Sequence, residues 1–113
     1  MSNCLFCKIA SGDIPATIVY RGPNVLAFRD IAPQAPTHIL VIPIKHLASV
    51  AVMQSGDVDL VGNLIATAAK IAESEGLQQG YRLVINTGSQ GGQSVDHVHV
   101  HILGGRQMTW PPG

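Results

Sequence analysis

The stretch HVHVHILG, residues 97–104, places a histidine at every second position and follows each one with valine or isoleucine. Because successive side chains of a β-strand point to opposite faces, His97, His99 and His101 would share one face. The branched residues between them would line the other face, and such residues favour strands over helices. The stretch therefore predicts a strand that lies on a core with one face and presents three imidazoles on the other.

Length and composition predict one globular domain that spans residues 1–113. The chain is 46% hydrophobic and 12% charged, with no net charge when the histidines are neutral. This balance argues against a nucleic-acid polymer as partner, because such a partner needs a broad basic surface, whereas a mononucleotide needs only a pocket. The sequence contains no run of about 18 apolar residues and no secretory leader, so we expect a cytoplasmic protein that does not enter a membrane.

The pattern along the chain predicts an α+β fold, with a five-stranded antiparallel sheet that carries one long helix and a short N-terminal helix. Asn3 is expected to cap the short helix and Gly12 to end it, while Gly76 ends the long one. We expect helices at residues 3–10 and 56–75, strands at 17–20, 25–30, 37–43, 81–88 and 97–104, a glycine-rich loop at 89–93 and an irregular tail.

Two chemistries suit three imidazoles on one strand face. Zinc could bind alternate histidines, or one imidazole could act as a nucleophile while its neighbours assist it. The loop TGSQGGQS before the strand favours the second, because Gly91 and Gly92 let the backbone approach an anion. Ser94 and Asn86 could hydrogen-bond the oxygens of that anion. The residues alone leave both chemistries open.

The stretch HVHVHIL matches the signature of the histidine triad (HIT) family, in which histidines alternate with apolar residues. The longer stretches DIAPQAPTHILVIP and GGQSVDHVHVHILGGRQMTWPPG resemble the Hint branch, the histidine triad nucleotide-binding proteins. The agreement extends without gaps from FCKIASGDIPA to the terminal WPPG. The resemblance implies a five-stranded antiparallel sheet with one long helix, paired into a homodimer whose sheet is continuous. In this branch the tail that carries Trp110 approaches the site of the neighbouring subunit.

The resemblance also implies an activity, namely hydrolysis of purine nucleoside phosphoramidates to release AMP or GMP from an amine. His99 would be the nucleophile and would form a nucleotidyl-histidine intermediate. His101 would contact the phosphate, and His38 would work with His97 to orient the nucleophile. Ser94 matches a serine near the leaving group. Other matches near the phosphate are Asn86, Gly92 and Gln93.

A nucleotide pocket follows from the same matches. Asp30 matches the acid that accepts both ribose hydroxyls. The purine slot would be lined by apolar residues that could equally be plain core, and these are Leu5, Phe6, Ile9, Phe28 and Ile31. Purine mononucleotides and their phosphoramidates are thus the expected ligands.

Catalysis needs no cofactor under this interpretation, but a structural zinc has a matching ligand set. Some bacterial members of the family hold zinc through residues that correspond to Cys4, Cys7, His46 and His97. These would form a Cys2His2 set suited to tetrahedral zinc. The alternative is that both cysteines are small apolar residues of the first helix. With zinc present, His97 would no longer be available as a proton relay with His38.

Several points stay open at the level of sequence. Asp96 stands where relatives carry an aromatic residue, and it would either sit at a strand end or lower local stability if buried. Arg29 would either pair with Asp30 or point to solvent. A dinucleoside polyphosphate hydrolase and a nucleotide-binding interaction protein with little turnover are alternative functions. The terminal GGRQMTWPPG favours Hint over the former, and His101 argues against a nucleotidyl transferase, which carries glutamine there.

Overall fold

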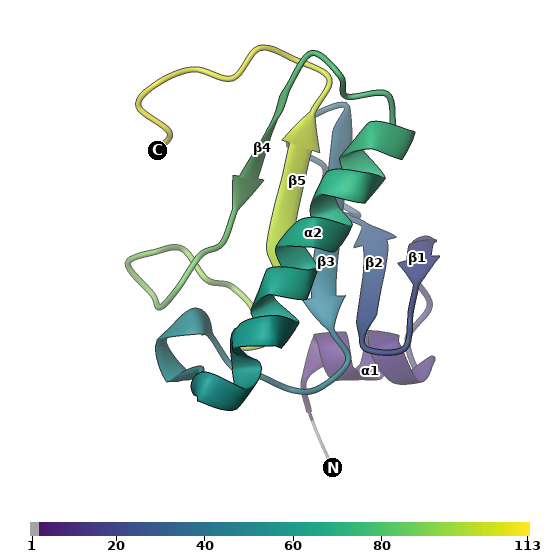
Figure 1. Cartoon of the computed structure of the whole chain (residues 1–113), viewed down its shortest axis with the longest axis vertical. Coiled ribbons are helices and arrows are strands. Elements are labelled where there is room, and N and C mark those ends of the chain that lie inside the picture. Colours follow the sequence, from purple (N-terminus) through teal and green to yellow (C-terminus); the bar gives the residue numbers. More distant parts are fainter. Residues whose placement is uncertain (1–2) are drawn as a thin grey trace.

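The chain folds as an α+β protein around a five-stranded antiparallel sheet with strand order β1-β2-β3-β5-β4 (Figure 1), and the computed structural model describes residues 3–113. The predicted fold class is confirmed. The helices are α1 (Leu5–Ser11), the short 3-10 turns η1 (Val50–Val52) and η2 (Ser55–Asp57), and α2 (Val58–Ser74). The strands are β1 (Ile18–Arg21), β2 (Val25–Arg29), β3 (Thr37–Pro43), β4 (Tyr81–Val84) and β5 (Val100–Gly104).

Strict alternation along the central strands divides the core into two layers. On one face, Val98, Val100 and Ile102 pack with the apolar side of α2, which crosses the sheet in Figure 1. On the other face, Leu40 and Ile42 pack with α1 and with part of β2. Because β3 is buried on both faces, its sequence is apolar almost throughout. The histidines of the final stretch lie on the α1 face.

The last strand begins later than predicted, at Val100 instead of His97. The backbone before it bonds elsewhere, because the amide of Val98 donates to the carbonyl of Leu47. The carbonyl of Pro43, at the end of β3, is taken by the His97 side chain at 2.8 Å. The alternation of side chains continues through this segment even though the ladder of backbone hydrogen bonds does not.

Other boundaries differ from the prediction by a few residues. Cys4, and not Asn3, caps α1, because the Cys4 sulfur accepts the amide of Cys7. The long helix begins at Val58, since the η2 turn occupies the residues before it. β4 ends at Val84, before the glycine-rich loop. Within residues 3–113, no helix has both the length and the apolar character that crossing a membrane requires.

Candidate active site

A pocket of about 250 Å³ opens on the α1 face of the sheet. Its residues come from α1 and the segment that follows it, from β2 and the segment that follows it, from β3 and β5, and from the segment before β5. The lining consists of Leu5, Phe6, Ile9, Ile14, Pro15, Ala16, Phe28, Arg29, Asp30, Ile31, Leu40, Ser94, Val95, His99 and His101. The structure therefore brings together two triad histidines, Ser94, Asp30 and all five apolar residues of the predicted slot.

His99 is buried, and one of its ring nitrogens is committed to the backbone. Its Nδ1 lies 2.7 Å from the carbonyl oxygen of His97. A carbonyl can only accept a hydrogen bond, so Nδ1 must carry the hydrogen and Nε2 must carry the lone pair. The edge of the ring also meets Phe6, with centroids 5.1 Å apart at 89°. The neutral ring of His99 thus presents the lone pair of Nε2 in a fixed orientation, as a nucleophile requires.

His101 is held in the complementary tautomer by a short chain of hydrogen bonds. The backbone amide of Gln34 donates to His38 Nδ1 at 3.0 Å, so the hydrogen of neutral His38 is on Nε2. That Nε2 donates to His101 Nδ1 at 2.9 Å, which leaves the hydrogen of His101 on its own Nε2. A neutral N–H in a pocket is a hydrogen-bond donor for an anion such as a phosphoryl oxygen.

Burial keeps this pair of histidines neutral. Desolvation, together with the neighbouring His99 and His38, lowers the pKa of His101 to about 4, against the opposing effect of Asp30. Desolvation also lowers the pKa of His38, again opposed by the Asp30 carboxylate. Both rings are therefore neutral at neutral pH and carry a single N–H each, in agreement with the hydrogen-bond chain.

The expected pairing of His38 with His97 is wrong, since His38 contacts His101 instead. The register of the sheet explains this, because His38 lies opposite Leu103 on β5. His97 is six residues from Leu103, which corresponds to about 20 Å along an extended chain. His101 is the nearest histidine on the same face. His97 lies near the far end of β3, where its Nε2 bonds the carbonyl of Pro43.

The Asp30 carboxylate lies at the edge of the pocket, beside this hydrogen-bond chain. Its Oδ1 accepts the amide of Ala32 at 2.8 Å, and its Oδ2 lies 3.5 Å from His38 Nε2. The carboxylate is 21% exposed, so a ligand can still reach it. This placement fits the expected contact with a sugar hydroxyl.

The apolar slot contains residues of two kinds. Phe6, Ile9 and Phe28 belong to the buried core as well as to the pocket wall, while Leu5 and Ile31 are exposed at its mouth. Leu40 was missed, although alternation from His38 along β3 would have placed it on the same face. The lining residues of the segment after α1 carry no periodic signal from which they could have been found.

The glycine-rich loop does not line the pocket as the sequence suggested. Asn86, Gly92 and Gln93 are absent from the lining. Both amide hydrogens of Gln93 are already used, by the carbonyls of Ala48 and Val95, and its oxygen accepts the amide of Gly88. A side chain at Gly91 would overlap the backbone of Thr87. These residues shape the loop, and Ser94 and Val95 just after it line the pocket.

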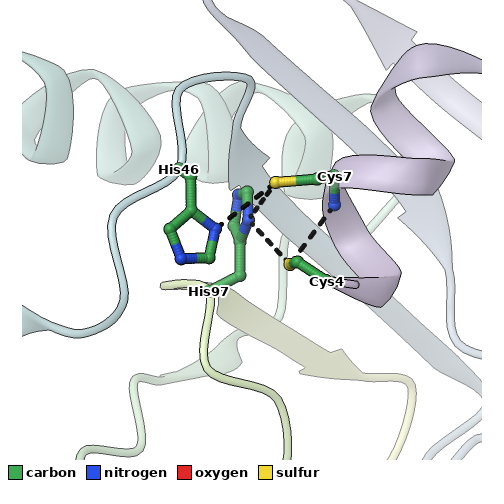
Figure 2. A group of neighbouring side chains, drawn as sticks. All are labelled: Cys4, Cys7, His46 and His97. Atoms are coloured by element: carbon green, nitrogen blue, oxygen red, sulfur yellow. Dashed lines mark hydrogen bonds between the residues drawn. The ribbon is translucent and has the colours of Figure 1, made fainter. Parts of the chain in front are cut away.

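Four side chains converge at the start of α1 (Figure 2), with their ligand atoms within 4.8 Å of one another: Cys4, Cys7, His46 and His97. The sulfur-to-nitrogen distances are 3.4 Å from Cys4 to His97, 3.3 Å from Cys7 to His46 and 3.5 Å from Cys7 to His97. With Zn–S of about 2.3 Å and Zn–N of about 2.1 Å, a tetrahedral site would give about 3.6 Å. The arrangement fits the size of zinc.

The tautomer of His97 also fits a metal ligand. Its Nε2 must carry the hydrogen, because it faces the carbonyl of Pro43, so the lone pair of Nδ1 faces the two sulfurs. Burial lowers the pKa of His97, which favours the neutral form that binds metal. A hydrogen bond from the remaining N–H of the ring to a backbone carbonyl is the usual second contact of a metal-binding histidine.

A second cluster, Asp30 with His38 and His101, has the residue types of a metal site. The position of the hydrogen on His38, however, leaves no lone pair for a metal. The amide of Gln34 occupies the lone pair of His38 Nδ1, so Nε2 carries a hydrogen and cannot bind a metal at the same time. Moving that hydrogen to Nδ1 would place it against the amide hydrogen of Gln34. The cluster therefore serves as a fixed hydrogen-bond chain.

The two residues left open by the sequence are both accounted for. Asp96 is exposed in a bend before β5, so it buries no charge. Arg29 turns away from Asp30 and pairs with Glu75 at the end of α2, with both carboxylate oxygens 3.0 Å from Nη2.

Comparison with known proteins gives consistent matches over the whole chain. Residues 11–108 match the model of the HIT domain. The 14 kDa zinc-binding protein of Zea mays is 54% identical over 99% of this chain and 89% of its own length. The adenylylsulfatase HINT1 of Arabidopsis thaliana is 51% identical over 99% of this chain and 78% of its own. A crystal structure of a HIT family hydrolase from Legionella pneumophila is 60% identical, with a TM-score of 0.96 over 98% of this chain and 100% of its own.

We predict that stability falls as the pH is lowered from about 6.5 to 4. In this window the unfolded chain binds protons at positions 38 and 101 that the folded chain does not bind, because burial lowers both pKa values. Urea denaturation at a series of pH values would measure the slope. His101→Gln should flatten it, and Gln90→Ala in an exposed loop should not. An unchanged slope in His101→Gln would contradict the neutral assignment of this residue.

Proposed function

The chain belongs to the HIT family, and on that premise we propose that it hydrolyses the bond between an amine and the phosphate of a purine nucleoside monophosphate. The observation that supports this most directly is the tautomer of His99. Its Nδ1 hydrogen is held by the carbonyl of His97, so Nε2 has a lone pair for attack on phosphorus. The HIT hydrolase of Legionella pneumophila supports the hydrolytic chemistry, whereas the P–N bond is our proposal.

The reaction would proceed in two displacements. His99 Nε2 attacks the phosphorus and the P–N bond breaks, and the departing amine takes a proton from water at the exposed mouth of the pocket, beside Ser94. The hydroxide left there is neutralised by the proton that the second step releases. The carbonyl of His97 then faces a cationic ring, since the Nδ1 hydrogen remains in place. Water attacks the phosphorus in the second step, the N–P bond to His99 breaks, and the released monophosphate and a proton leave. The hydrogen on His101 Nε2 stabilises the phosphoryl oxygens in both steps.

The pocket walls would hold the nucleoside. Phe6 and Phe28 meet edge to face, with centroids 5.5 Å apart, and present apolar surface for a purine. The exposed part of the Asp30 carboxylate would accept ribose hydroxyls. Because Ser94 and Ile31 are exposed at the mouth, many leaving groups could be accommodated.

Adenylyl sulfate is a second candidate substrate, because the Arabidopsis thaliana relative is named an adenylylsulfatase. Its hydrolysis would use the same attack on phosphorus, with sulfate in place of the amine as leaving group. Sulfate needs no proton to leave, so this substrate places fewer demands on the mouth of the pocket.

We predict that adenosine phosphoramidate is converted to AMP and that His99→Ala lowers turnover by at least about 10³-fold, since the nucleophile is lost. His101→Ala should lower it by roughly 10²-fold, because one donor to the phosphoryl oxygens is removed. Release of AMP followed by chromatography would measure both, and mass spectrometry after a rapid denaturing quench at alkaline pH, where a P–N bond persists, should detect nucleotide on wild-type protein and none on His99→Ala.

The same assay separates the alternatives. Adenylyl sulfate and a dinucleoside polyphosphate are tested in parallel, and Gln90→Ala serves as an exposed control. Faster turnover of the dinucleoside polyphosphate would favour that branch of the family. Tight AMP binding with no turnover of any substrate would contradict the proposal and favour a nucleotide-binding interaction protein.

We also propose that Cys4, Cys7, His46 and His97 hold a structural zinc ion. The distances among their donor atoms, the lone pair of His97 and the name of the Zea mays relative support this. The metal would fix the chain at this point. It would supply no step of the reaction, since the attacking nitrogen, His99 Nε2, is not one of its ligands. Thiolate ligands persist in a reducing compartment, in keeping with a cytoplasmic location.

Protein purified without chelator should contain about one zinc per chain by elemental analysis. Cys7→Ser should reduce this to below about a tenth, because one of the two soft ligands is lost. Ser11→Ala, on the same helix but outside the ligand set, is the matched control. A zinc content below about a tenth in wild-type protein would rule out the assignment.

We propose further that two copies form a homodimer with a continuous sheet. β4 ends the sheet, and within residues 3–113 no strand pairs with its outer edge. Trp110 is 81% exposed in the tail beside it, where Arg82 donates to the carbonyl of Thr109. An open strand edge and a large exposed aromatic side chain both favour association.

Light scattering after size-exclusion chromatography should therefore give twice the chain mass of 11.9 kDa. Proline at Leu83 should shift the protein toward monomer if the β4 edge is the contact, because proline cannot donate to a ladder. Circular dichroism would confirm that this variant still folds. A wild-type monomer at micromolar concentration would contradict the proposal.

A further inference from the structure

We infer that the metal at Cys4, Cys7, His46 and His97 positions the nucleotide slot and the His99 ring through Phe6, so that nucleotide affinity depends on metal occupancy. The inference rests on the proposed function, because it concerns the same pocket. It differs from a purely structural role for the metal, which would stabilise the whole chain without a particular effect on the slot.

Phe6 lies on α1, the helix that carries Cys7 and is capped by Cys4. It stands between the ligands Cys4 and Cys7 in sequence, and its side chain is 5% exposed. Leu5 and Ile9 on the same short helix also line the pocket. The helix and its N-cap therefore carry two metal ligands and three residues of the slot lining. A movement of this helix at the metal would also move the slot.

Phe6 touches the rings of three other residues. Its centroid lies 6.0 Å from that of the ligand His97 and 5.1 Å from that of His99, both in edge-to-face geometry. It also meets Phe28, a second ring that lines the slot, at 5.5 Å. Phe6 is thus in contact with the metal cluster, the nucleophile and a second ring of the slot lining.

Without the metal, α1 has little stability of its own. The helix has seven residues, which is too short for independent stability in water. Its N-cap is the sulfur of Cys4, which accepts the amide of Cys7 at 3.4 Å. A metal-bound thiolate keeps its charge and its position, so it caps the helix better than a mobile thiol would. Removing the metal loosens the cap and both sulfur attachments together.

His101 should be spared, which makes the effect selective. Its orientation depends on His38 and on the backbone of Gln34, and these residues lie at the other end of β3 from the metal cluster. Loss of metal should therefore disturb the purine slot and His99 while the donor to the phosphoryl oxygens stays in place.

The test compares zinc-loaded protein with the same full chain after removal of the metal by a chelator. The probe is AMP, whose affinity is measured by calorimetry, and hydrogen exchange is followed for residues 5–11 and for α2 as internal reference. We expect AMP affinity to fall at least tenfold and residues 5–11 to exchange at least tenfold faster, while α2 keeps its protection. Restored zinc should reverse both changes.

Phe6→Leu provides the second arm, because it keeps all four ligands and removes only the ring. It should retain zinc and fold, yet bind AMP at least tenfold more weakly and shift the ring signals of His99. Ser11→Ala, exposed at the end of α1, is the control and should match wild type. If removal of zinc also unfolds α2, the metal stabilises the whole chain and the inference is overturned.

Equal AMP affinity with and without zinc, or in zinc-loaded Phe6→Leu and wild type, would overturn the inference. If the loaded wild-type protein binds no AMP, the proposed function fails. In that case exchange at residues 5–11 and the His99 ring signals decide the coupling, with loss of protection and altered signals supporting it and unchanged values overturning it.

Discussion

Each buried imidazole must satisfy two ring nitrogens, and this requirement organises the whole site. Within residues 3–113 no buried side-chain nitrogen or oxygen lacks a hydrogen-bond partner. A carbonyl opposite one nitrogen forces the hydrogen to that side and the lone pair to the other. Three histidines that look equivalent in sequence are thereby given three different states. His97 offers Nδ1 to sulfur, His99 offers Nε2 to the pocket, and His101 offers a hydrogen.

The partners differ because the three histidines lie at different places on the sheet. His97 precedes β5 and reaches the end of β3, where the carbonyl of Pro43 is available. His101 lies within the ladder opposite Leu40, close to His38 on the same face. His99, between them, uses the backbone of its own segment. Alternation of side chains places the three rings on one face. Their different positions along that face give them different hydrogen-bond partners, and hence different tautomers.

Local pattern was enough to predict the common face, the sheet and the long helix, because alternation and helical spacing are local properties of the chain. It could not decide which histidine pairs with His38, since that depends on the register between β3 and β5. Nor could it show that the Gln93 amide would be used by three backbone groups, two of them nearby in sequence and the third, at Ala48, distant. Gly91 follows the same logic, because the close approach of Thr87 that requires a glycine arises only once the loop has closed. The family resemblance grouped the five apolar slot residues, which no periodicity connects and which line one pocket in the structure.

The Cys-x-x-Cys spacing links the metal cluster to the pocket through the geometry of one helical turn. Cys4 as N-cap and Cys7 three residues later bring both sulfurs to the same end of α1, while Phe6 between them faces the sheet. A domain of 113 residues has a modest core, and a short terminal helix adds little stability of its own. Attachment to a metal would hold such a helix in place more rigidly than two buried apolar side chains can. Because that helix is also a wall of the slot, the attachment bears on ligand binding as well as on folding.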